Sequence, residues 1–261
     1  MDLNFLEADW RPPFHSYLIN LPRRKDRLRR MSDIRPACLD YLRAETLGKK
    51  FDADIFTAED LASYGYFPWK ADSQLGYNQL IYPNWHRPLK LGEIGCAIAH
   101  HSCWIDSQQR DLSYALILED DVVFVQDFCD RLQAGLRLLS RDYSDWDLLY
   151  LGRLSTEPDR QQLQGLVVPG FSYFTHGYIL SRRGVNKVLA TDYLSSIIPV
   201  DEFLPALYLD HPRADVRARY PKVLNAFAFE PQIVTQLPKD EGGSDTEASG
   251  FLEAFGESKC V

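Results

Sequence analysis

Short hydrophobic runs recur along the chain, separated by longer stretches in which apolar residues follow helical spacing. Many of the runs are bounded by proline, glycine or charged residues, which is typical of buried strands. The segments predicted to form strands are "HSYLIN" (15–20), "FDADIFTA" (51–58), "YALILEDD" (114–121), "WDLLYLG" (146–152), "YFTHGYILS" (173–181) and, as strand or extended chain, "AFAFEPQIVTQ" (226–236).

Apolar positions three or four residues apart predict helices between these strands. The predicted helices cover residues 23–34, 92–110, 127–140, 182–191 and 200–210, and Pro205 is expected to break or kink the last one. Alternation of strands and helices indicates an α/β fold with a mainly parallel sheet covered on both faces. Ligands of such sheets bind beyond the carboxyl ends of the strands.

The length of 261 residues and a hydrophobic content of 45% allow one large domain with a substantial core. We expect this domain to cover residues 1–238. Residues 239–261 are polar and acidic, and this composition predicts a mobile tail or lid. The irregular, aromatic-rich segment 60–90 is expected to be a functional loop, or else simply to pack on the domain.

The formal net charge of −8 argues against a broad surface for nucleic acid or anionic membrane. Residues 1–15 contain no apolar region typical of a signal peptide, and no apolar run is long enough to span a bilayer. These observations predict a cytoplasmic protein with at most peripheral membrane contact. The five cysteines form no CxxC pair, so we expect free thiols, no disulfide framework, and a reducing compartment.

Three consecutive acids, Glu119, Asp120 and Asp121, end one predicted buried strand. Carboxylates held this close repel each other, and a divalent cation such as Mg²⁺ or Mn²⁺ would relieve the repulsion while sharing phosphate oxygens. Side chains alternate along a strand, so a regular strand would place Glu119 and Asp121 together as metal ligands and Asp120 on the opposite side. The alternative is an acidic turn that precedes a helix capped by Asp127.

A basic run from Arg23 to Arg30 follows the first predicted strand. Arginines beside strand-end amides suit a diphosphate, and Arg24 and Arg27 are nearest to the strand end. The alternative is a solvated helix face, which we favour for Arg29 and Arg30.

Other candidates are individually ambiguous. His176 could be a third metal ligand or a hydrogen-bonded core residue, and His100 could line a site or be buried. Asp201 or Glu202 could deprotonate an acceptor hydroxyl, although Asp201 is also placed to cap a helix. No P-loop, GxGxxG, HExxH or GxSxG motif is present, which disfavours the corresponding kinases, dehydrogenases, metalloproteases and hydrolases.

In order along the chain, several of these segments resemble glycosyltransferase family 25, which includes bacterial lipooligosaccharide galactosyltransferases and collagen hydroxylysine galactosyltransferase domains. The matching stretches are "YLINLPRRKDRLRRM", "LGEIGCAIAHHSCW", "ALILEDDVVF", "THGYILSRRGVNKVL", "IPVDEFL" and "EPQIVTQ…GGSD". The resemblance implies a GT-A type, Rossmann-like fold, a UDP-sugar donor, a Mn²⁺ or Mg²⁺ cofactor and inversion at the anomeric carbon.

The same resemblance implies roles for particular residues. Those implied to lie near the nucleotide or line the donor site are Asn20, Leu21, Arg24, Arg27, Glu93, Gly95, Cys96 and His100, with Asp120 beside the metal ligands Glu119 and Asp121. Gly177 and Tyr178 would face the acceptor, and Asp201 would be the late acid of the family. The sequence departs from the family pattern at Ala99, where a serine is usual, and lacks an "A-x-D-G" turn after the second strand.

The expected activity is transfer of a hexose, galactose or glucose, to a hydroxyl of a glycan, lipooligosaccharide or protein. Two alternatives remain at this point. A metal-dependent sugar nucleotidyltransferase would need similar acids and arginines but would release pyrophosphate. A non-catalytic sugar-binding protein could use the same fold.

Overall fold

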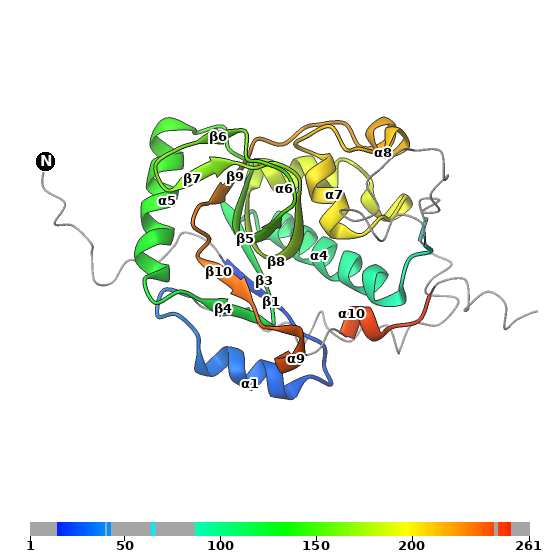
Figure 1. Cartoon of the computed structure of the whole chain (residues 1–261), viewed down its shortest axis with the longest axis horizontal. Helices are drawn as coiled ribbons and strands as arrows, with labels where there is room; N and C mark the ends of the chain where they lie inside the picture. The colour runs from blue at the N-terminus through cyan, green and yellow to red at the C-terminus, as the bar shows by residue number, and fades with distance from the viewer. Residues whose placement is uncertain (1–14, 40, 43–63, 66–86, 243–244, 252–261) are drawn as a thin grey trace, which may run out of the picture.

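The computed structural model describes residues 15–39, 41–42, 64–65, 87–242 and 245–251, and every structural statement below concerns them. The predicted strand 51–58 and most of the predicted aromatic loop lie outside these ranges. Figure 1 shows a central sheet with helices packed on either side.

Eight strands form the large sheet in the order β2-β1-β3-β8-β5-β9-β7-β6. They are β1 (His15–Ile19), β2 (Tyr41–Leu42), β3 (Tyr114–Glu119), β5 (Leu148–Ser155), β6 (Gln161–Gln162), β7 (Leu166–Val168), β8 (Ser172–Ser181) and β9 (Ala226–Phe229). Strand β1 is parallel to β2 and β3, and β5 is parallel to β9. Strand β8 is antiparallel to both of its neighbours, so the sheet is mixed.

The helices alternate with the strands, as the sequence pattern predicts. They are α1 (Lys25–Asp33), α4 (Leu91–Gln109), α5 (Phe128–Asp142), α6 (Arg182–Leu189), the 3₁₀ turn η2 (Tyr193–Ser195), α7 (Val200–Ala206), α8 (Ala214–Arg219), α9 (Lys239–Gly242) and α10 (Asp245–Ala248). Pro205 lies inside α7, which ends one residue later.

Two hydrophobic cores lie on opposite faces of the sheet. One core joins α4, α6 and α7 to the sheet and includes Trp104 and Tyr178. The other joins α1 and α5 to the opposite face and includes Met31 and Leu132. Side chains of neighbouring residues on β3 divide between the two cores, as strand geometry requires, since Ile117 belongs to the first and Leu118 to the second. The predicted α/β class with helices flanking a sheet is confirmed.

A second, two-stranded sheet pairs β4 (Val122–Phe124) with β10 (Val234–Gln236) in antiparallel register. Strand β3 therefore ends at Glu119, and Asp120 and Asp121 occupy a turn before β4. The predicted strand 226–236 is in fact β9 and β10, with the cis peptide bond of Glu230–Pro231 between them. This second sheet brings Gln236 beside the acidic turn.

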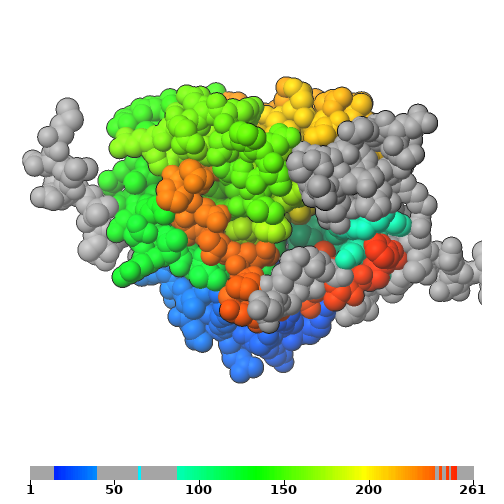
Figure 2. Space-filling model, in the orientation of Figure 1, coloured from blue at the N-terminus to red at the C-terminus, as the bar shows by residue number. Residues whose placement is uncertain are grey.

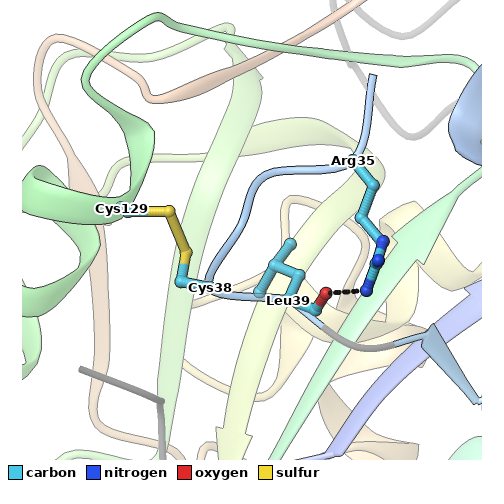
Figure 3. The surroundings of a disulfide bond; sticks show 4 residues. All are labelled: Arg35, Cys38, Leu39 and Cys129. Carbon is cyan, nitrogen blue, oxygen red and sulfur yellow. Dashed lines mark hydrogen bonds between the residues drawn. A yellow bond between two sulfur atoms is a disulfide. The ribbon is translucent and has the colours of Figure 1, made fainter. Parts of the chain in front are cut away.

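The structure contains a disulfide between Cys38 and Cys129, so the prediction of cysteines without disulfides is wrong (Figure 3). The bond joins the chain after α1 to the first turn of α5 across 91 positions of sequence. A pairing this distant leaves no local spacing signal in the sequence. Cys96 and Cys103 are free thiols. The expectation of a reducing compartment drew partly on that prediction and loses this support.

The segment after β10 returns to the sheet end. Its helix α10 packs on the start of α4, where the Gly92 amide donates to Ser249 Oγ at 2.9 Å and the Leu91 amide donates to the Gly250 carbonyl at 2.8 Å. Figure 2 shows α10 beside the start of α4 and the preceding segment beside α1. In the described part of the chain, no helix has both the length and the apolar character needed to cross a membrane.

Candidate functional site

Glu119 is the last residue of β3 and lies where the paired strand β1 also ends. Thr175 Oγ1 donates to its Oε1 at 3.1 Å, and His100 Nε2 lies 3.3 Å from the same oxygen. Burial alone would raise the pKa of this carboxyl, but the hydrogen bonds from His100 and Thr175 bring the pKa below its ordinary value. Glu119 is therefore held as an anion.

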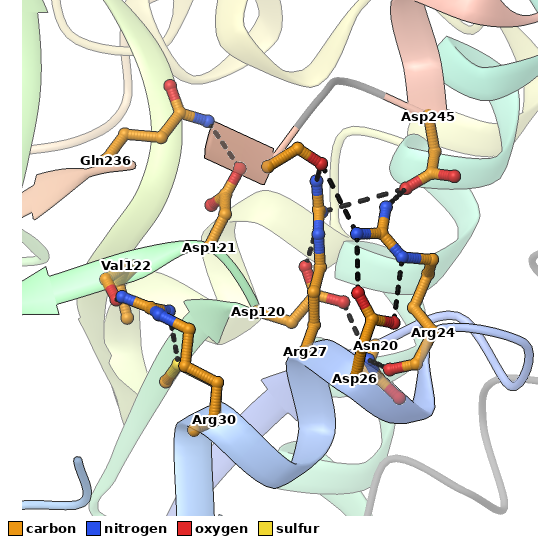
Figure 4. Close-up of polar contacts among 12 residues, drawn as sticks. Asn20, Arg24, Asp26, Arg27, Arg30, Asp120, Asp121, Val122, Gln236 and Asp245 are labelled. Carbon is orange, nitrogen blue, oxygen red and sulfur yellow. Dashed lines mark hydrogen bonds and ion pairs between the residues drawn. The ribbon is translucent and has the colours of Figure 1, made fainter. Parts of the chain in front are cut away.

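Both carboxylate oxygens of Asp120 have hydrogen-bond donors from Asn20, after β1, and Arg27, on α1, so Asp120 is not left open for a cation (Figure 4). Asn20 Nδ2 donates to one carboxylate oxygen at 2.6 Å, and Arg27 donates to the other at 2.8 Å. Burial raises the pKa of Asp120, opposed by Arg27 and Asn20. Asp120 thus fixes Arg27 and Asn20 at the end of β1, and both side chains are buried with it.

Asp121 is the third acid of the turn, and one of its two carboxylate oxygens lacks a hydrogen bond among the described residues. Gln236 Nε2 donates to its Oδ2 at 2.8 Å, whereas Oδ1 is buried and has no hydrogen-bond partner among the described residues. Burial, the negative charge of Glu119 and that of Asp120 raise the pKa of Asp121 to about 7, although the Gln236 hydrogen bond opposes them. Binding of a cation in place of the proton would stabilise such a carboxylate.

The acidic turn fits a divalent cation. The hydrogen bonds to Glu119 fall on Oε1, and Asp121 keeps a buried oxygen without a donor. Carboxylate oxygens are the ligands that Mg²⁺ and Mn²⁺ prefer. His176 is also buried, and burial lowers its pKa, which favours the neutral imidazole that binds metals. These three residues are the ones that would hold the ion.

A different group of potential ligands also approaches closely. Atoms of Cys96, His100 and Glu119 all lie within 4.8 Å of one another. Burial raises the pKa of the Cys96 thiol well above its ordinary value, and the carboxylates of Glu119, Asp201, Glu93 and Asp121 raise it further. A thiol that keeps its proton is a poor metal ligand. The negative charges of these carboxylates therefore act on one half-buried thiol, and a carboxylate oxygen of Glu119 lies within 4.8 Å of it.

The predicted phosphate-binding arginines lie together at the end of β1, and both contact the C-terminal segment (Figure 4). Arg24 donates to Asp245 at 2.6 Å and forms a bidentate pair with Asp26. Arg27 donates to the Gly242 carbonyl at 2.8 Å. Both guanidinium groups therefore contact the Gly242 carbonyl and lie close to the carboxylate of Asp245.

Asn20 and Leu21 form the turn between β1 and α1. Asn20 Nδ2 lies 3.1 Å from the Arg24 carbonyl, and the Leu21 carbonyl accepts from the Arg24 amide at 2.9 Å. Leu21 is half-buried and contributes its backbone to this turn. The turn places Arg24 beside the acidic residues.

Glu93 has a capping role at the start of α4. Its carboxylate accepts from both terminal nitrogens of Arg87, at 2.9 and 2.5 Å, and from the Lys90 amide at 2.8 Å. The last contact is half of a capping box, which satisfies an otherwise unpaired amide at a helix start. Glu93 thus shapes the helix end beside the site, and its oxygens already have donors.

The two acids of α7 differ in environment. Glu202 is buried and its Oε2 lies 3.0 Å from His211 Nε2. Asp201 is half-buried, and burial together with the charges of Glu202, Glu93 and Glu119 raises its pKa well above its ordinary value. The charges of the acidic site therefore act on Asp201, whereas the carboxylate of Glu202 is paired with His211.

Tyr178 does not face an acceptor site, contrary to the expectation for this strand. It is fully buried and its hydroxyl contacts His100 Nδ1 at 2.8 Å and Trp104 Nε1 at 3.0 Å. A close approach of backbone and side chain occurs at Gly152 on β5. A Cβ atom there would lie 2.0 Å from the Val234 carbonyl oxygen and 2.5 Å from His176 Nε2.

Several residues of this site carry no recognisable signal in the sequence alone. Thr175, Gln236 and Asp245 each contact a predicted site residue across more than 50 positions of the chain. Gln236 and Asp245 lie in "EPQIVTQ…GGSD", so the resemblance pointed to the segment but not to these partners. Thr175 was inside a predicted strand, one position from His176.

Comparison with known proteins shows which family the chain resembles. The family model "Glycosyltransferase family 25 (LPS biosynthesis protein)" matches residues 14–204. Procollagen galactosyltransferase 1-A of Xenopus laevis is 36% identical over 247 residues, which cover 89% of this chain and 38% of that protein. Procollagen galactosyltransferase 1 of Danio rerio is 34% identical, covering 91% of this chain and 39% of that protein.

A further relative is the inactive glycosyltransferase 25 family member 3 of Homo sapiens, 34% identical over 89% of this chain and 39% of that protein. Among solved structures, A197 from STIV aligns with a TM-score of 0.29 at 11% identity, covering 55% of this chain and 68% of that chain. The chain spans less than two fifths of the length of the two procollagen galactosyltransferases. The family match and these relatives show that the chain belongs to glycosyltransferase family 25.

Proposed function

We propose that this protein transfers a hexose, with galactose favoured, from a UDP-sugar to a hydroxyl group, with Mn²⁺ or Mg²⁺ bound at Glu119 and Asp121. The observation that carries the proposal is the acidic turn with Glu119 and Asp121, whose middle residue Asp120 pairs with Arg27 at 2.8 Å, with Arg24 close by. Carboxylates for a cation, guanidinium groups for a diphosphate and a separate acid are the parts that such a transfer needs.

Glu119 and Asp121 would hold a cation whose positive charge would offset the negative charge of the departing UDP. Gln236 and Thr175 orient these two carboxylates through the hydrogen bonds described above. Arg24 and Arg27 present guanidinium groups to the phosphates, where negative charge accumulates during bond cleavage.

Asp201 is the proposed general base. The acceptor oxygen attacks the anomeric carbon on the face opposite to the diphosphate, the bond from that carbon to the phosphate oxygen breaks, and the acceptor proton passes to Asp201. This single displacement inverts the anomeric configuration. A raised pKa makes Asp201 a stronger base than an ordinary aspartate, provided that it is ionised when the acceptor binds. Glu202 is the less suitable base because its carboxylate is paired with His211.

The names of the procollagen galactosyltransferases favour a protein acceptor, and a hydroxyl of a collagen-type peptide is the first to test. A glycan or lipooligosaccharide hydroxyl is the second.

The test is UDP release from a panel of UDP-sugars, with and without each acceptor, in Mn²⁺ or in EDTA. We expect turnover of one donor, lost in EDTA and in Asp121→Asn, with the β-anomer as product. Asp142→Asn, which alters an exposed acid on α5, is the matched control and should keep full activity. Pyrophosphate in place of UDP as the product would contradict the proposal and favour a nucleotidyltransferase.

A non-catalytic role is the second candidate, because one relative of similar identity carries the name of an inactive family member. It predicts that the folded protein binds Mn²⁺ and UDP-sugar but releases no UDP with any donor and acceptor. Turnover in the same assay would exclude it.

A further inference from the structure

We propose that Tyr178 and Trp104 are positioning residues that fix the tautomer of His100, so that His100 donates a hydrogen bond to Glu119 and orients it for the cation. The inference rests on the proposed function, since it assigns a role to residues around the same metal ligand. It makes His100 a group that orients Glu119, in place of a residue that binds metal or donor directly.

The contacts form an unbroken chain from the core to the site. Trp104 Nε1 lies 3.0 Å from the Tyr178 hydroxyl, which lies 2.8 Å from His100 Nδ1. His100 Nε2 lies 3.3 Å from Glu119 Oε1. Trp104, Tyr178 and His100 are each 0% exposed, so water does not compete for these contacts.

The direction of each hydrogen bond follows from chemistry. An indole nitrogen can only donate, so the Tyr178 oxygen accepts from Trp104. The hydroxyl proton of Tyr178 then has His100 Nδ1 as its acceptor among the contacts that the structure shows. A neutral imidazole that accepts at Nδ1 carries its proton at Nε2. The Nε2–H group therefore points its proton at Glu119.

The other tautomer would be unfavourable for two reasons. Its Nε2 lone pair would face the Glu119 carboxylate, and both groups would be acceptors. Its Nδ1–H group would compete with Trp104 for the Tyr178 oxygen and leave the hydroxyl proton of Tyr178 without an acceptor in the core. The Trp104–Tyr178 pair thus selects the tautomer that binds Glu119.

As a consequence, the two carboxylate oxygens of Glu119 have different roles. Oε1 accepts from both His100 and Thr175, which leaves Oε2 as the oxygen for the cation. Partners that orient a ligand in this way commonly change metal affinity by about 10- to 100-fold when they are removed. Ring packing adds rigidity, since His100 stacks on Tyr178 with an interplanar angle of 17°.

The first experiment needs no variant. Long-range ¹H–¹⁵N spectra of the wild-type protein report which nitrogen of His100 carries the proton, with His100→Gln used to assign the signals. We expect the Nε2–H tautomer in the metal-free protein. A dominant Nδ1–H tautomer would overturn the proposal.

The second experiment is Tyr178→Phe, with Mn²⁺ affinity measured from the electron paramagnetic resonance signal of free Mn²⁺. We expect the Mn²⁺ Kd to rise by about 10-fold or more and the His100 signals to shift toward the Nδ1–H form. Tyr193→Phe is the matched control, because it removes a buried hydroxyl from the same core that donates to the Ile198 carbonyl instead. It should lose similar stability but keep the Mn²⁺ Kd.

The outcomes separate this inference from the proposed function. Equal Mn²⁺ affinity in Tyr178→Phe and wild type overturns the positioning role while the proposed function stands. Equal losses of affinity in both tyrosine variants would also overturn it, since they would reflect general destabilisation. If the wild type binds no Mn²⁺, the proposed function fails. The role of Trp104, Tyr178 and His100 in metal binding then fails too, whatever tautomer His100 shows.

Discussion

Asp121 joins two properties that seldom coexist in one side chain, a buried oxygen without a donor and a pKa near neutrality. Its environment disfavours the anion in the metal-free protein. Binding of the proposed cation would offset that cost, which would explain why a residue so poorly solvated is an acid.

This environment predicts a pH dependence of stability. The folded Asp121 keeps its proton up to about pH 7, whereas the unfolded chain loses it near the ordinary pKa of 3.8. Between these values the folded state binds the extra proton, so stability from this group falls as pH rises. We expect the metal-free wild type to lose more thermal stability between pH 5 and pH 8 than Asp121→Asn does. Mn²⁺ should remove most of the difference, and equal losses in both proteins without metal would contradict the assignment.

The two neighbouring acids of α7 should separate chemistry from stability. Asp201→Asn is expected to lower kcat by about 10²- to 10⁴-fold, because the general base is lost, with little loss of thermal stability. Glu202→Gln should cost about 1–3 kcal/mol of stability, because a buried partner of His211 is weakened, yet retain most of kcat. Steady-state kinetics and thermal melts of both variants test this, and a larger kcat loss in Glu202→Gln would reverse the roles.

At the scale of elements, the segment that contains α9 and α10 covers the arginines proposed to bind phosphate. Asp245 pairs with Arg24 and lies 3.7 Å from Arg27, in the region where a diphosphate would place its own negative charge. Donor and Asp245 therefore compete for the same guanidinium groups.

Removing this competitor should tighten donor binding. We expect Asp245→Asn to lower the Kd for UDP about two- to fivefold, the size that a partly exposed ion pair allows. Calorimetric titration with UDP in the presence of Mn²⁺ measures this, and the effect should shrink at high salt. Asp142→Asn is again the control. Weaker UDP binding in Asp245→Asn would mean that Asp245 holds the arginines in place for the donor.

The disulfide acts between two elements of the second core, because it joins the chain after α1 to α5. Breaking a loop closure of 91 residues is expected to cost about 2–4 kcal/mol. Dithiothreitol should therefore lower the melting temperature of the wild type but not that of a Cys38→Ser, Cys129→Ser double variant. Cys103→Ala, at a buried free thiol, should respond to the reductant like the wild type. No response in the wild type would show that the two thiols are not paired.

At the scale of the whole molecule, local patterns predicted the helices and strands well, but they predicted contacts between distant segments poorly. The helix at 92–110 and the strand at 114–121 were predictable because periodicity and burial repeat within a few residues. The strand end at Glu119 was not, because β4 pairs with β10 more than 100 positions later and turns Asp120 and Asp121 out of the strand. Regular alternation along the strand therefore failed as a guide there.

In the candidate site too, single residues were predictable and their long-range contacts were not. The resemblance and the strand ends pointed to Glu119, Asp121 and Arg27, but not to what each of them touches. The bond from Arg27 to Asp120 crosses 93 positions and that from Asn20 to Asp120 crosses 100, so neither leaves a trace in a local window. Glu93 is an exception, since a glutamate in the first turn of a strongly predicted helix is a recognisable capping residue.

The ion pair between Arg24 and Asp245 joins residues 221 positions apart. During synthesis, β1, β3 and the acidic turn leave the ribosome long before Gln236 and Asp245 do. A nascent chain therefore holds three clustered carboxylates without the amide that orients Asp121, and it cannot complete the site until the last of these segments has emerged. Contacts of such long range also favour slow folding.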